Sequence, residues 1–298
     1  MMDVCMFGAG SLGSLIGGML ARTHDVTLVG REPHVSAIDS DGLRLTGALD
    51  EQVWPAARTT PPDRADLAIV TVKSFDTEAA AHALADVNLD GALSLQNGMG
   101  NEETLAAHLA CPVLAGTCTY GARLAEPGTV ECTGVGEIHL GPRAGGTSAL
   151  ADRVGEAFQS AGLDAAVDAD MPRRLWEKLS VNAGINATTA LARLPNGALV
   201  KGPAGGVARE AARETARVAS AEGAGLTPDA AAAQMRAVAE TTAPNTSSMQ
   251  QDVLAGRRTE VDAINGYVVE RASGPVPVNE TLANLLRAWE REQGLREQ

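Results

Sequence analysis

Polar residues recur at four-residue spacing within one otherwise apolar stretch in the second half of the chain. In the segment LWEKLSVNAGINATTA, Lys178, Asn182 and Asn186 stand at positions i, i+4 and i+8. At about 100° per residue they drift by only about 40° per step, so a helix would carry them as one polar stripe. A lysine ammonium can stabilise negative charge that develops on an oxygen and then donate a proton to it. The stripe predicts a lined pocket, and the alternative is a solvent-facing helix edge.

A second group of polar residues lies in the segment PNTSSMQQDVLAGRRTEVDAINGY. Asn245 is a candidate N-cap, and Ser248 would lie in the first helical turn, where free amides and a hydroxyl could bind a substrate carboxylate. Simple capping is the alternative. Glu260 follows Ser248 by twelve residues, about 120° around an ideal helix, so the two share a face only if the helix bends, for example at Gly256. For Glu260 the alternative is a surface ion-pair cluster with the two preceding arginines.

The start of the chain carries a G-x-G-x-x-G motif between a strand-like and a helix-like run. The first glycine permits a tight turn, the second lets backbone approach a pyrophosphate, and the third lets helix and strand pack closely. Amides at the helix N-terminus then face the phosphates. In this context the motif predicts a nicotinamide dinucleotide site rather than a merely glycine-rich turn. Its residues are Gly8, Ala9, Gly10, Ser11, Leu12 and Gly13.

Arg31 follows the second strand-like run, VTLVG. An NAD-specific enzyme usually has an acidic residue here for the ribose 2'-hydroxyl, whereas a guanidinium suits the 2'-phosphate of NADP. The sequence therefore favours NADPH. The neighbouring Glu32 leaves NADH use open, and a solvated arginine is the alternative.

Two further strand-like runs end in polar residues. LAIVTV leads into Lys73, and ALSL leads into Asn97. Parallel strands point their carboxyl ends at one crevice, so we expect both residues to face the nicotinamide half of the cofactor and the substrate. The alternatives are an ordinary exposed lysine and a plain Asn97-Gly98 turn.

The elements that must position these residues differ between the two halves of the chain. In the first half, short apolar runs alternate with helical patterns, which indicates an α/β fold with a parallel sheet. The segment TVECTGVGEIHLG, residues 129–141, resembles a hairpin, and a last strand is expected near residues 164–167. Beyond Asp170 the periodicity is helical. We predict a Rossmann dinucleotide-binding domain over residues 1–167 and an all-helical substrate domain over residues 168–298.

Charge limits the partners of the chain. The 298 residues include 37 acidic and 24 basic side chains, a formal charge of -13. Long-range repulsion disfavours nucleic acid and anionic lipid, so any phosphate must be bound by local geometry. A saline cytoplasm is an alternative source of this acidity. We expect a small-molecule substrate, no nucleic acid and no membrane partner, and the sequence leaves a homodimer open.

The cysteines and the N-terminal stretch indicate a cytoplasmic protein. No CxxC spacing occurs, which favours buried free thiols, and we expect no metal. Asp3 stands where a signal peptide would be basic, and glycines interrupt the apolar run that follows. No stretch approaches the roughly 20 apolar residues of a membrane span. The four cysteines are Cys5, Cys111, Cys118 and Cys132.

The chain resembles the ketopantoate reductase family over nearly its full length. The family implies an NADPH-dependent reduction of 2-dehydropantoate (ketopantoate) to (R)-pantoate in pantothenate and coenzyme A biosynthesis. It also implies a Rossmann domain followed by a helical domain. The resemblance rests on FGAGSLG, VTVKSF, LQNGMG, LWEKLSVNAGIN, LPNGAL and NTSSMQQDVLAGRRTEVDAINGY.

The same resemblance implies roles for individual residues. Lys178 matches the catalytic lysine, and Glu260 matches a carboxylate near the ribose and that lysine. Lys73, Asn97 and Ala122 match residues that line the nicotinamide end of the cofactor site. Where the family usually has Asn-Pro-Leu-Thr, this chain has Asn-Ala-Thr-Thr from Asn186 onward, so we expect a less sharply bent helix end beside the pocket. The residues matching substrate-binding positions are Asn97, Asn182, Asn186, Asn196, Asn245 and Ser248.

Two other functions stay open at this point. One is a reductase for a different branched 2-oxo acid, with the same lysine and asparagines. The other is a non-catalytic protein that senses NADPH, which Lys178 and Glu260 argue against because sensing needs no proton donor. A lysine donor also fits better than a histidine, since no histidine lies in the helical half. The five are His24, His34, His82, His108 and His139.

Overall fold

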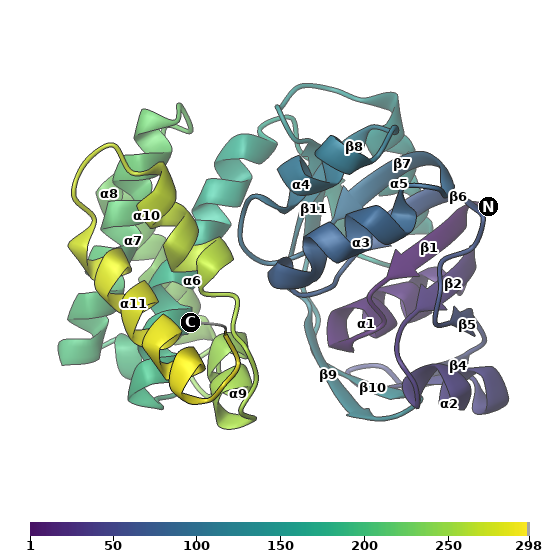
Figure 1. Cartoon of the computed structure of the whole chain (residues 1–298), viewed down its shortest axis with the longest axis horizontal. Coiled ribbons are helices and arrows are strands. Elements are labelled where there is room, and N and C mark those ends of the chain that lie inside the picture. The colour runs from purple at the N-terminus through teal and green to yellow at the C-terminus, as the bar shows by residue number, and fades with distance from the viewer. Residues whose placement is uncertain (297–298) are drawn as a thin grey trace. The chain divides into compact units, whose positions relative to one another are not determined.

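The computed structural model describes residues 1–296, which form two units (Figure 1). The first contains residues 1–96 and 101–171. The second contains the short segment Asn97–Gly100 and the chain from Pro172 onward. The first unit is mixed α/β and the second is helical, so the predicted fold class is confirmed.

An eight-stranded sheet forms the centre of the first unit. Its strand order is β12-β11-β8-β7-β6-β1-β2-β5, and every described pair is parallel except β11 with β8. Its strands are β1 (Asp3–Phe7), β2 (Asp25–Val29), β5 (Ala56–Arg58), β6 (Arg64–Val70), β7 (Asn88–Ser94), β8 (Val113–Cys118), β11 (Ile138–Pro142) and β12 (Ala165–Val167).

The order of the strands creates a switch point beside β1. From β1 the chain moves outward to β2 and β5, and it then returns to β6 on the other side of β1. Open parallel sheets bind ligands outside the carboxyl ends of their strands at such a point. The turn after Phe7 and the loop after Val70 both lie at this edge. The topology therefore places the glycine motif and Lys73 at the carboxyl edge of neighbouring strands.

Helices cover both faces of this sheet, because alternate side chains of each strand point to opposite faces. Cys5 of β1 packs in the cluster that contains the apolar side of α3 and α4, whereas Val4 and Met6 pack in the cluster of α1 and α5. The helices of this unit are α1 (Ser11–Leu20), α2 (His34–Asp41), α3 (Thr77–Leu84), α4 (Asn101–His108) and α5 (Ala149–Ser160), with the 3-10 turn η1 (Ser74–Asp76).

A second sheet lies on the outer side of α1. Two adjacent glycines of α1 make the contacts, because a Cβ on Gly17 would stand 2.5 Å from Leu28 of the main sheet. A Cβ on Gly18 would stand 2.9 Å from Leu43 and Leu45 of the second sheet. The helix is thus packed between two sheets. The second sheet has the order β4-β3-β10-β9, with β3 (Leu43–Gly47), β4 (Glu51–Val53), β9 (Gly121–Glu126) and β10 (Thr129–Gly134).

The predicted hairpin over residues 129–141 is wrong. Both halves are strands, but β10 pairs with β9 and β3 in the second sheet, while β11 pairs with β8 and β12 in the main sheet. The local pattern indicated two strands correctly. It could not show that the loop between them leads from one sheet to the other.

The second unit consists of helices packed around a long helix, α6. Trp176, Leu179 and Ile185 of α6 lie in the apolar core of this unit. The elements are α6 (Met171–Ala192), the 3-10 turn η2 (Asn196–Leu199), α7 (Pro203–Ala221), α8 (Pro228–Thr241), α9 (Ser248–Leu254), the π-helical turn η3 (Asp262–Gly266), α10 (Tyr267–Arg271) and α11 (Pro277–Glu292).

Free cysteines occur as predicted. Cys5, Cys118 and Cys132 are buried, whereas Cys111 is only half-buried. Among residues 1–296, no helix combines the length and the hydropathy that crossing a bilayer requires.

Glu102 provides a test of how α4 is packed. Burial raises the pKa of Glu102 to about 7, although hydrogen bonds from its backbone amide and from Ser94 act to lower it. The folded state therefore holds a proton that the unfolded chain releases above its ordinary pKa, and stability falls as pH rises from about 4.5 to about 7. We predict that Glu102→Gln raises the free energy of unfolding by about 1–3 kcal/mol at pH 8 and changes it little at pH 4. Urea unfolding at both values checks this, and an equal effect at both would contradict it.

Candidate active site

The turn after β1 is held by hydrogen bonds to the neighbouring strand. Gly8 has a positive φ of 112°, and the amides of Gly8 and Ala9 both donate to the Val29 carbonyl at 2.9 and 2.8 Å. A Cβ on Gly8 would lie 2.7 Å from the backbone nitrogen of Val72. The first glycine of the motif is thus required by backbone conformation and by the close loop after β6.

The other two glycines of the motif serve different purposes. A Cβ on Gly13 would stand 2.2 Å from the Gly8 carbonyl oxygen and 2.5 Å from Thr71 Oγ1, so α1 can approach β1 only without a side chain here. A Cβ on Gly10 would meet only the Gly8 oxygen, at 4.0 Å. Protein packing therefore does not require Gly10 to be glycine. Open space in front of first-turn amides is the cradle that a pyrophosphate needs, so these residues fit a dinucleotide.

Ser11, the first residue of α1, also positions Ala122. Its hydroxyl accepts a hydrogen bond from the Leu124 amide at 3.0 Å, which ties the start of α1 to β9. Ala122 lies on β9, where it pairs with Cys132 of β10. The second sheet thus places Ala122 on a strand that is bonded directly to the glycine turn.

Arg31 lies just beyond β2, and its side chain is 91% exposed. Its guanidinium is 3.7 Å from the carboxylate of Asp76, a weak contact for so exposed a pair. The Glu32 carboxylate accepts hydrogen bonds from the amide and hydroxyl of Ser36 and is therefore tied to the first turns of α2. Arg58, which the sequence analysis missed, pairs with Val29 in the β2–β5 ladder. The end of β2 thus has two exposed guanidinium groups nearby.

A buried polar network supports the loop that carries Lys73. Gln96 Nε2 donates to the Val72 carbonyl at 3.0 Å and to Thr77 Oγ1 at 2.8 Å. The Thr77 hydroxyl in turn donates to Asn101 Oδ1 at 2.8 Å. Lys73 stands between Val72 and η1, half-buried. The network fixes the backbone on both sides of Lys73 and could not be found from the sequence, because its members are far apart in the chain.

In the second unit, the predicted polar stripe lies on one unbroken helix. Lys178 and Asn182 are half-buried and Asn186 is buried, although nearly all neighbouring residues of α6 are buried. The stripe is thus not an ordinary solvent-facing edge. The helix continues through the Asn-Ala-Thr-Thr segment to Ala192. The Thr189 hydroxyl lies 2.7 Å from the Ser247 hydroxyl, which joins this part of α6 to the start of α9.

The predicted capping role of Asn245 is wrong. Ser247 is the N-cap of α9, and its side chain accepts a hydrogen bond from the Gln250 amide. Asn245 is exposed and precedes the helix, and Ser248 is the first helical residue, also exposed. Adjacent serines, a threonine and an asparagine all favour capping, so sequence preference alone could not select the right one. Ser248 nonetheless lies in the first turn, as predicted.

Asn196 joins the loop before α9 to η2. Its amide donates to the Asn245 carbonyl at 3.0 Å, and its Nδ2 donates to Thr242 Oγ1 at 2.9 Å. Its Oδ1 is buried and has no hydrogen-bond partner among the described residues. A buried acceptor without a partner is costly and is typical of positions completed by a ligand or water.

Glu260 lies in an irregular segment rather than on the same helix as Ser248. The helix does not bend at Gly256 but ends there, because α9 stops at Leu254 and Gly256 has a φ of 63°. Glu260 itself is buried. Arg257 pairs with Asp252 at 3.1 Å, and Arg258 lies 3.8 Å from Asp262.

The segment around Glu260 is anchored by a fully buried carboxylate. Glu290 of α11 accepts hydrogen bonds from the Thr259 amide at 2.8 Å and the Thr259 hydroxyl at 2.6 Å. Its second oxygen accepts from Arg296 at 2.9 Å. Burial acts to raise the pKa of Asp262, but hydrogen bonds from Arg296 and Arg287 outweigh it and hold that pKa below its usual range. These paired charges fix the chain on both sides of Glu260.

The loop that contains Asn97 belongs to the same unit. The Met99 amide donates to the Ala263 carbonyl at 3.0 Å, and a Cβ on Gly98 would stand 2.5 Å from the Ala263 side chain. On the other side of this segment, Asn265 Nδ2 donates to the Ala183 carbonyl of α6 at 3.0 Å. The structure therefore brings Asn97, the Glu260 segment and the Asn182 region of α6 together through direct contacts.

Comparisons with known proteins decide the family. The model for "Ketopantoate reductase PanE/ApbA" matches residues 4–145, and that for its C-terminal part matches residues 170–290. The chain belongs to the ketopantoate reductase family. A 2-dehydropantoate 2-reductase of Halobacterium salinarum is 45% identical over 98% of this chain and 100% of its own length. One of Archaeoglobus fulgidus is 41% identical over 96% of this chain and 97% of its own.

Two solved structures agree with this fold. A PanE/ApbA family ketopantoate reductase of Ralstonia eutropha JMP134 superposes with a TM-score of 0.90 at 38% identity, covering 98% of this chain and 100% of that one. D-mandelate dehydrogenase, in a ternary structure with NADH and anilino(oxo)acetate, superposes with a TM-score of 0.91, covering 99% of this chain and all of its own, but at 24% identity it shows the fold alone. This chain, as a member of the ketopantoate reductase family, is therefore a reductase with a dinucleotide-binding unit.

The two glycines Gly10 and Gly13 form a matched pair for testing the dinucleotide site. We predict that Gly13→Ala lowers the free energy of unfolding by about 1–3 kcal/mol, because its Cβ collides with backbone. Gly10→Ala should leave that free energy nearly unchanged but weaken dinucleotide binding by about tenfold or more, or about 1.4 kcal/mol. Urea unfolding and fluorescence titration with NADPH separate the two effects. Unchanged NADPH affinity in Gly10→Ala would contradict the assignment of the site.

Proposed function

We propose that this protein is a 2-dehydropantoate 2-reductase, which reduces 2-dehydropantoate to (R)-pantoate with NADPH in pantothenate and coenzyme A biosynthesis. The observation that carries the proposal is the polar stripe on α6, with Lys178, Asn182 and Asn186 on a largely buried helix. Full-length similarity to curated 2-dehydropantoate 2-reductases supports the same substrate.

The first unit would bind NADPH through the residues from Gly8 to Gly13, with Lys73 and Ala122 at the nicotinamide end. Asn97 and Glu260 of the second unit are the other cofactor-binding residues that we propose, Asn97 for the nicotinamide end and Glu260 for the ribose. Bound there, NADPH supplies the hydride. The exposed guanidinium of Arg31 would bind the 2'-phosphate, and Arg58 at the end of β5 adds a second positive charge nearby. Glu32 is held by Ser36, so it is less able to reach a ribose hydroxyl, although NADH use stays open.

Lys178 would donate a hydrogen bond to the ketone oxygen of the substrate. As the carbonyl carbon is reduced, negative charge develops on that oxygen, and the ammonium group stabilises it electrostatically. The lysine then transfers its proton to the oxygen, which leaves a hydroxyl group on the product and a neutral amine on the enzyme. Glu260 is buried, and its carboxylate would orient Lys178.

The remaining polar residues would recognise the two ends of the substrate. 2-Dehydropantoate carries a carboxylate at one end and a primary hydroxyl at the other. The first-turn residue Ser248 suits the carboxylate, with Asn245 as a helper, whereas the unpartnered Oδ1 of Asn196 suits the hydroxyl as an acceptor. Asn97, Asn182 and Asn186 complete the set of substrate-binding residues.

A reductase for another branched 2-oxo acid is the second candidate. The Asn-Ala-Thr-Thr segment favours this second candidate. The segment lies next to the polar stripe, stays helical to Ala192 and differs from the usual family sequence. An NADPH-sensing protein is less favoured, since it needs no proton donor.

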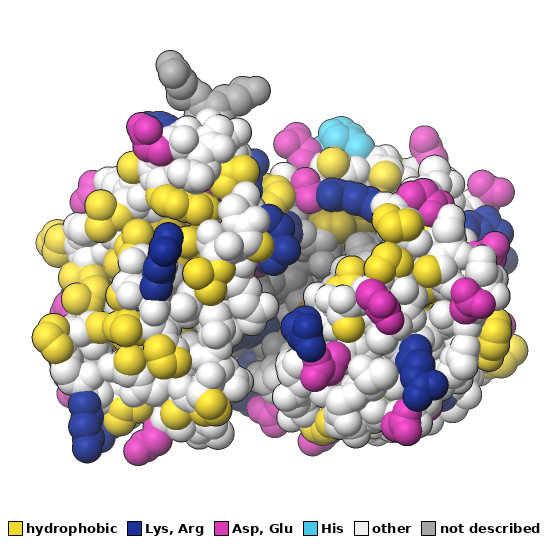
Figure 2. All heavy atoms as spheres, turned by 90° about the horizontal axis from the view of Figure 1, so that it is seen from below, with side chains coloured by type: hydrophobic (Ala, Val, Ile, Leu, Met, Phe, Trp, Pro, Cys, Tyr) yellow, Lys and Arg dark blue, Asp and Glu magenta, His cyan; other side chains and the backbone are white. Residues whose placement is uncertain are grey.

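We further propose a cytoplasmic location and no nucleic-acid partner, and a homodimer stays open. Acidic and basic side chains are interspersed on the face of each unit drawn in Figure 2.

The direct test is to follow NADPH and NADH oxidation with a panel of 2-oxo acids. We expect 2-dehydropantoate to give the highest kcat/KM and NADPH to be preferred over NADH. Arg31→Ala should raise the KM for NADPH by about tenfold and leave that for NADH nearly unchanged, because only NADPH has the 2'-phosphate. Another oxo acid as the best substrate would favour the second candidate, and no turnover with any would favour the sensor.

Lys178 can be tested separately from substrate choice. We predict that Lys178→Ala lowers kcat by about 10²-fold or more, the scale expected for loss of a general acid, while NADPH affinity changes little. The chain has three lysines, and the exposed Lys201 provides a matched control, since Lys201→Ala should leave kcat unchanged. Near-wild-type turnover in Lys178→Ala would overturn its role as proton donor.

A further inference from the structure

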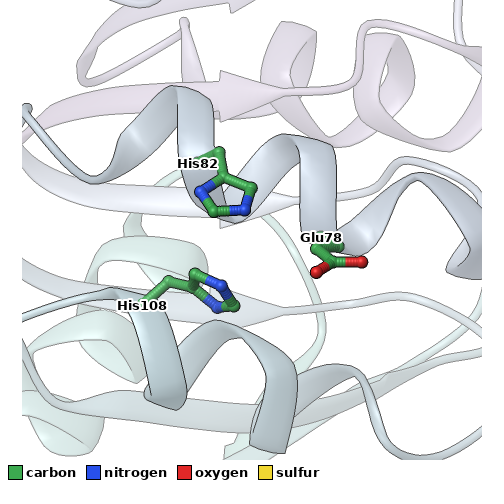
Figure 3. A group of neighbouring side chains, drawn as sticks. All are labelled: Glu78, His82 and His108. Carbon is green, nitrogen blue, oxygen red and sulfur yellow. The ribbon is translucent and has the colours of Figure 1, made fainter.

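Three side chains that bind metals well gather on the outer side of α3 and α4. Glu78 and His82 lie one turn apart on α3, and His108 is the last residue of α4. Figure 3 shows the two imidazoles extending toward each other from the two helices, with Glu78 on the side of His82. One ligand atom from each of the three residues lies within 4.8 Å of the other two. The sequence analysis expected no metal. The two histidines are 26 residues apart in the chain, and the packing of α3 against α4 brings them together.

The hydrogen bonding of His108 leaves one of its nitrogens available to a metal. Its Nδ1 lies 2.9 Å from the Thr104 carbonyl oxygen, which can only accept, so Nδ1 carries the proton and donates. Nε2 of the neutral ring then keeps its lone pair. Metal-binding histidines are typically oriented in this way, by donation from the second ring nitrogen to a carbonyl or carboxylate.

We propose that Glu78, His82 and His108 bind one divalent cation of the borderline class, such as Zn²⁺, Ni²⁺ or Cu²⁺. Two imidazole nitrogens and one carboxylate oxygen suit these ions, whereas Mg²⁺ and Ca²⁺ require oxygen ligands. Three protein ligands leave at least one coordination position for water. None of the three residues is among the proposed dinucleotide- or substrate-binding residues, and the site does not depend on the proposed function.

The backbone under the three residues is fixed, while their side chains can adjust. Leu84 of α3 and Leu105 of α4 are fully buried in the same apolar cluster, which holds the two helices at a set spacing. Donor atoms around a tetrahedral zinc ion stand about 3.4 Å apart, given bond lengths of about 2.1 Å. The ligand atoms need to approach by about 1.4 Å at most from their limit of 4.8 Å. Glu78 and His82 are exposed, so rotation of their side chains supplies this movement.

The surroundings favour a cation and allow it to enter. Glu78 and His108 line a hollow of about 540 Å³ that also contains Glu103 and Thr104. The hollow thus has two carboxylates, and Glu103 is partly neutralised by Arg143 at 3.0 Å. The His82 and His108 rings make an edge contact, with centroids 4.5 Å apart at 74°. Two neutral imidazoles would make the same contact without a metal, and a metal titration distinguishes a metal-binding pair from a simple ring contact.

The experiment is calorimetric titration of the untagged holoenzyme with ZnCl₂ at pH 7.5. We expect one equivalent of Zn²⁺ to bind, and His82→Ala or His108→Ala to weaken it by more than the roughly 10- to 100-fold that loss of an outer-shell partner costs. Glu78→Gln should also weaken binding. Lowering the pH to about 5 should release the ion, because a protonated imidazole cannot ligate it.

Two control variants distinguish ligation from charge and from other histidines. Glu103→Gln removes a carboxylate from the same hollow, and His139→Ala removes a histidine outside it, so both should bind Zn²⁺ nearly as the wild type does. With Cu²⁺, the electron paramagnetic resonance spectrum should show coupling to imidazole nitrogens that disappears in the His82→Ala/His108→Ala variant. The proposal is overturned if millimolar Zn²⁺ does not bind, or if the double variant, shown to be folded by circular dichroism, binds Zn²⁺ as tightly as the wild type.

Discussion

The dinucleotide-binding unit depends on the close contact of α1 with the strands on either side of it. Gly13 brings the start of the helix against the Gly8 carbonyl, and Gly17 and Gly18 bring its middle against one sheet on each side. Because packed interiors cannot tolerate even one added methyl group at such distances, these positions fix where the first-turn amides point. The glycine turn, the Thr71 loop and β9 all take their positions from this helix.

In the helical unit, a buried carboxylate and its partners act together with apolar packing of Val261 and Ile264 to hold the segment around Glu260. Glu290 is fully buried, yet its two oxygens serve Thr259 and Arg296, so its desolvation is compensated. Loss of one partner from such a group costs far more than loss of the whole set, because an unpaired charge remains. The contacts of Glu290 position the irregular segment that contains Glu260, which has few backbone hydrogen bonds of its own, and this role matters more than their contribution to stability.

Secondary structure and motifs could be predicted from the sequence wherever the pattern was local. The alternation of β1, β2, β6, β7 and β8 with helices, the glycine turn, the continuous α6 and the first-turn place of Ser248 all follow from periodicity and motif context, whereas β3, β4 and β5 were not predicted. Pairings between segments that are far apart in the chain could not be predicted from local patterns. Thus β10 and β11 belong to different sheets, Ser247 caps α9 instead of Asn245, and Arg58 reaches the end of β2 only through strand pairing. The Asn97 loop was placed correctly at a strand end, but its contact with Ala263 depends on tertiary packing.

The assignment of residues 97–100 to the helical unit affects how family members can be recombined. A chimera joined only near Met171 would combine the Gly98 loop of one parent with the Ala263 region of another. Their contact has no room for a Cβ on Gly98, so the two segments must be exchanged as one piece even though 165 positions separate Gly98 from Ala263 in the chain. A recombination scheme that moves residues 97–100 together with the C-terminal half would preserve this contact, and one that cuts the chain at a single point would not.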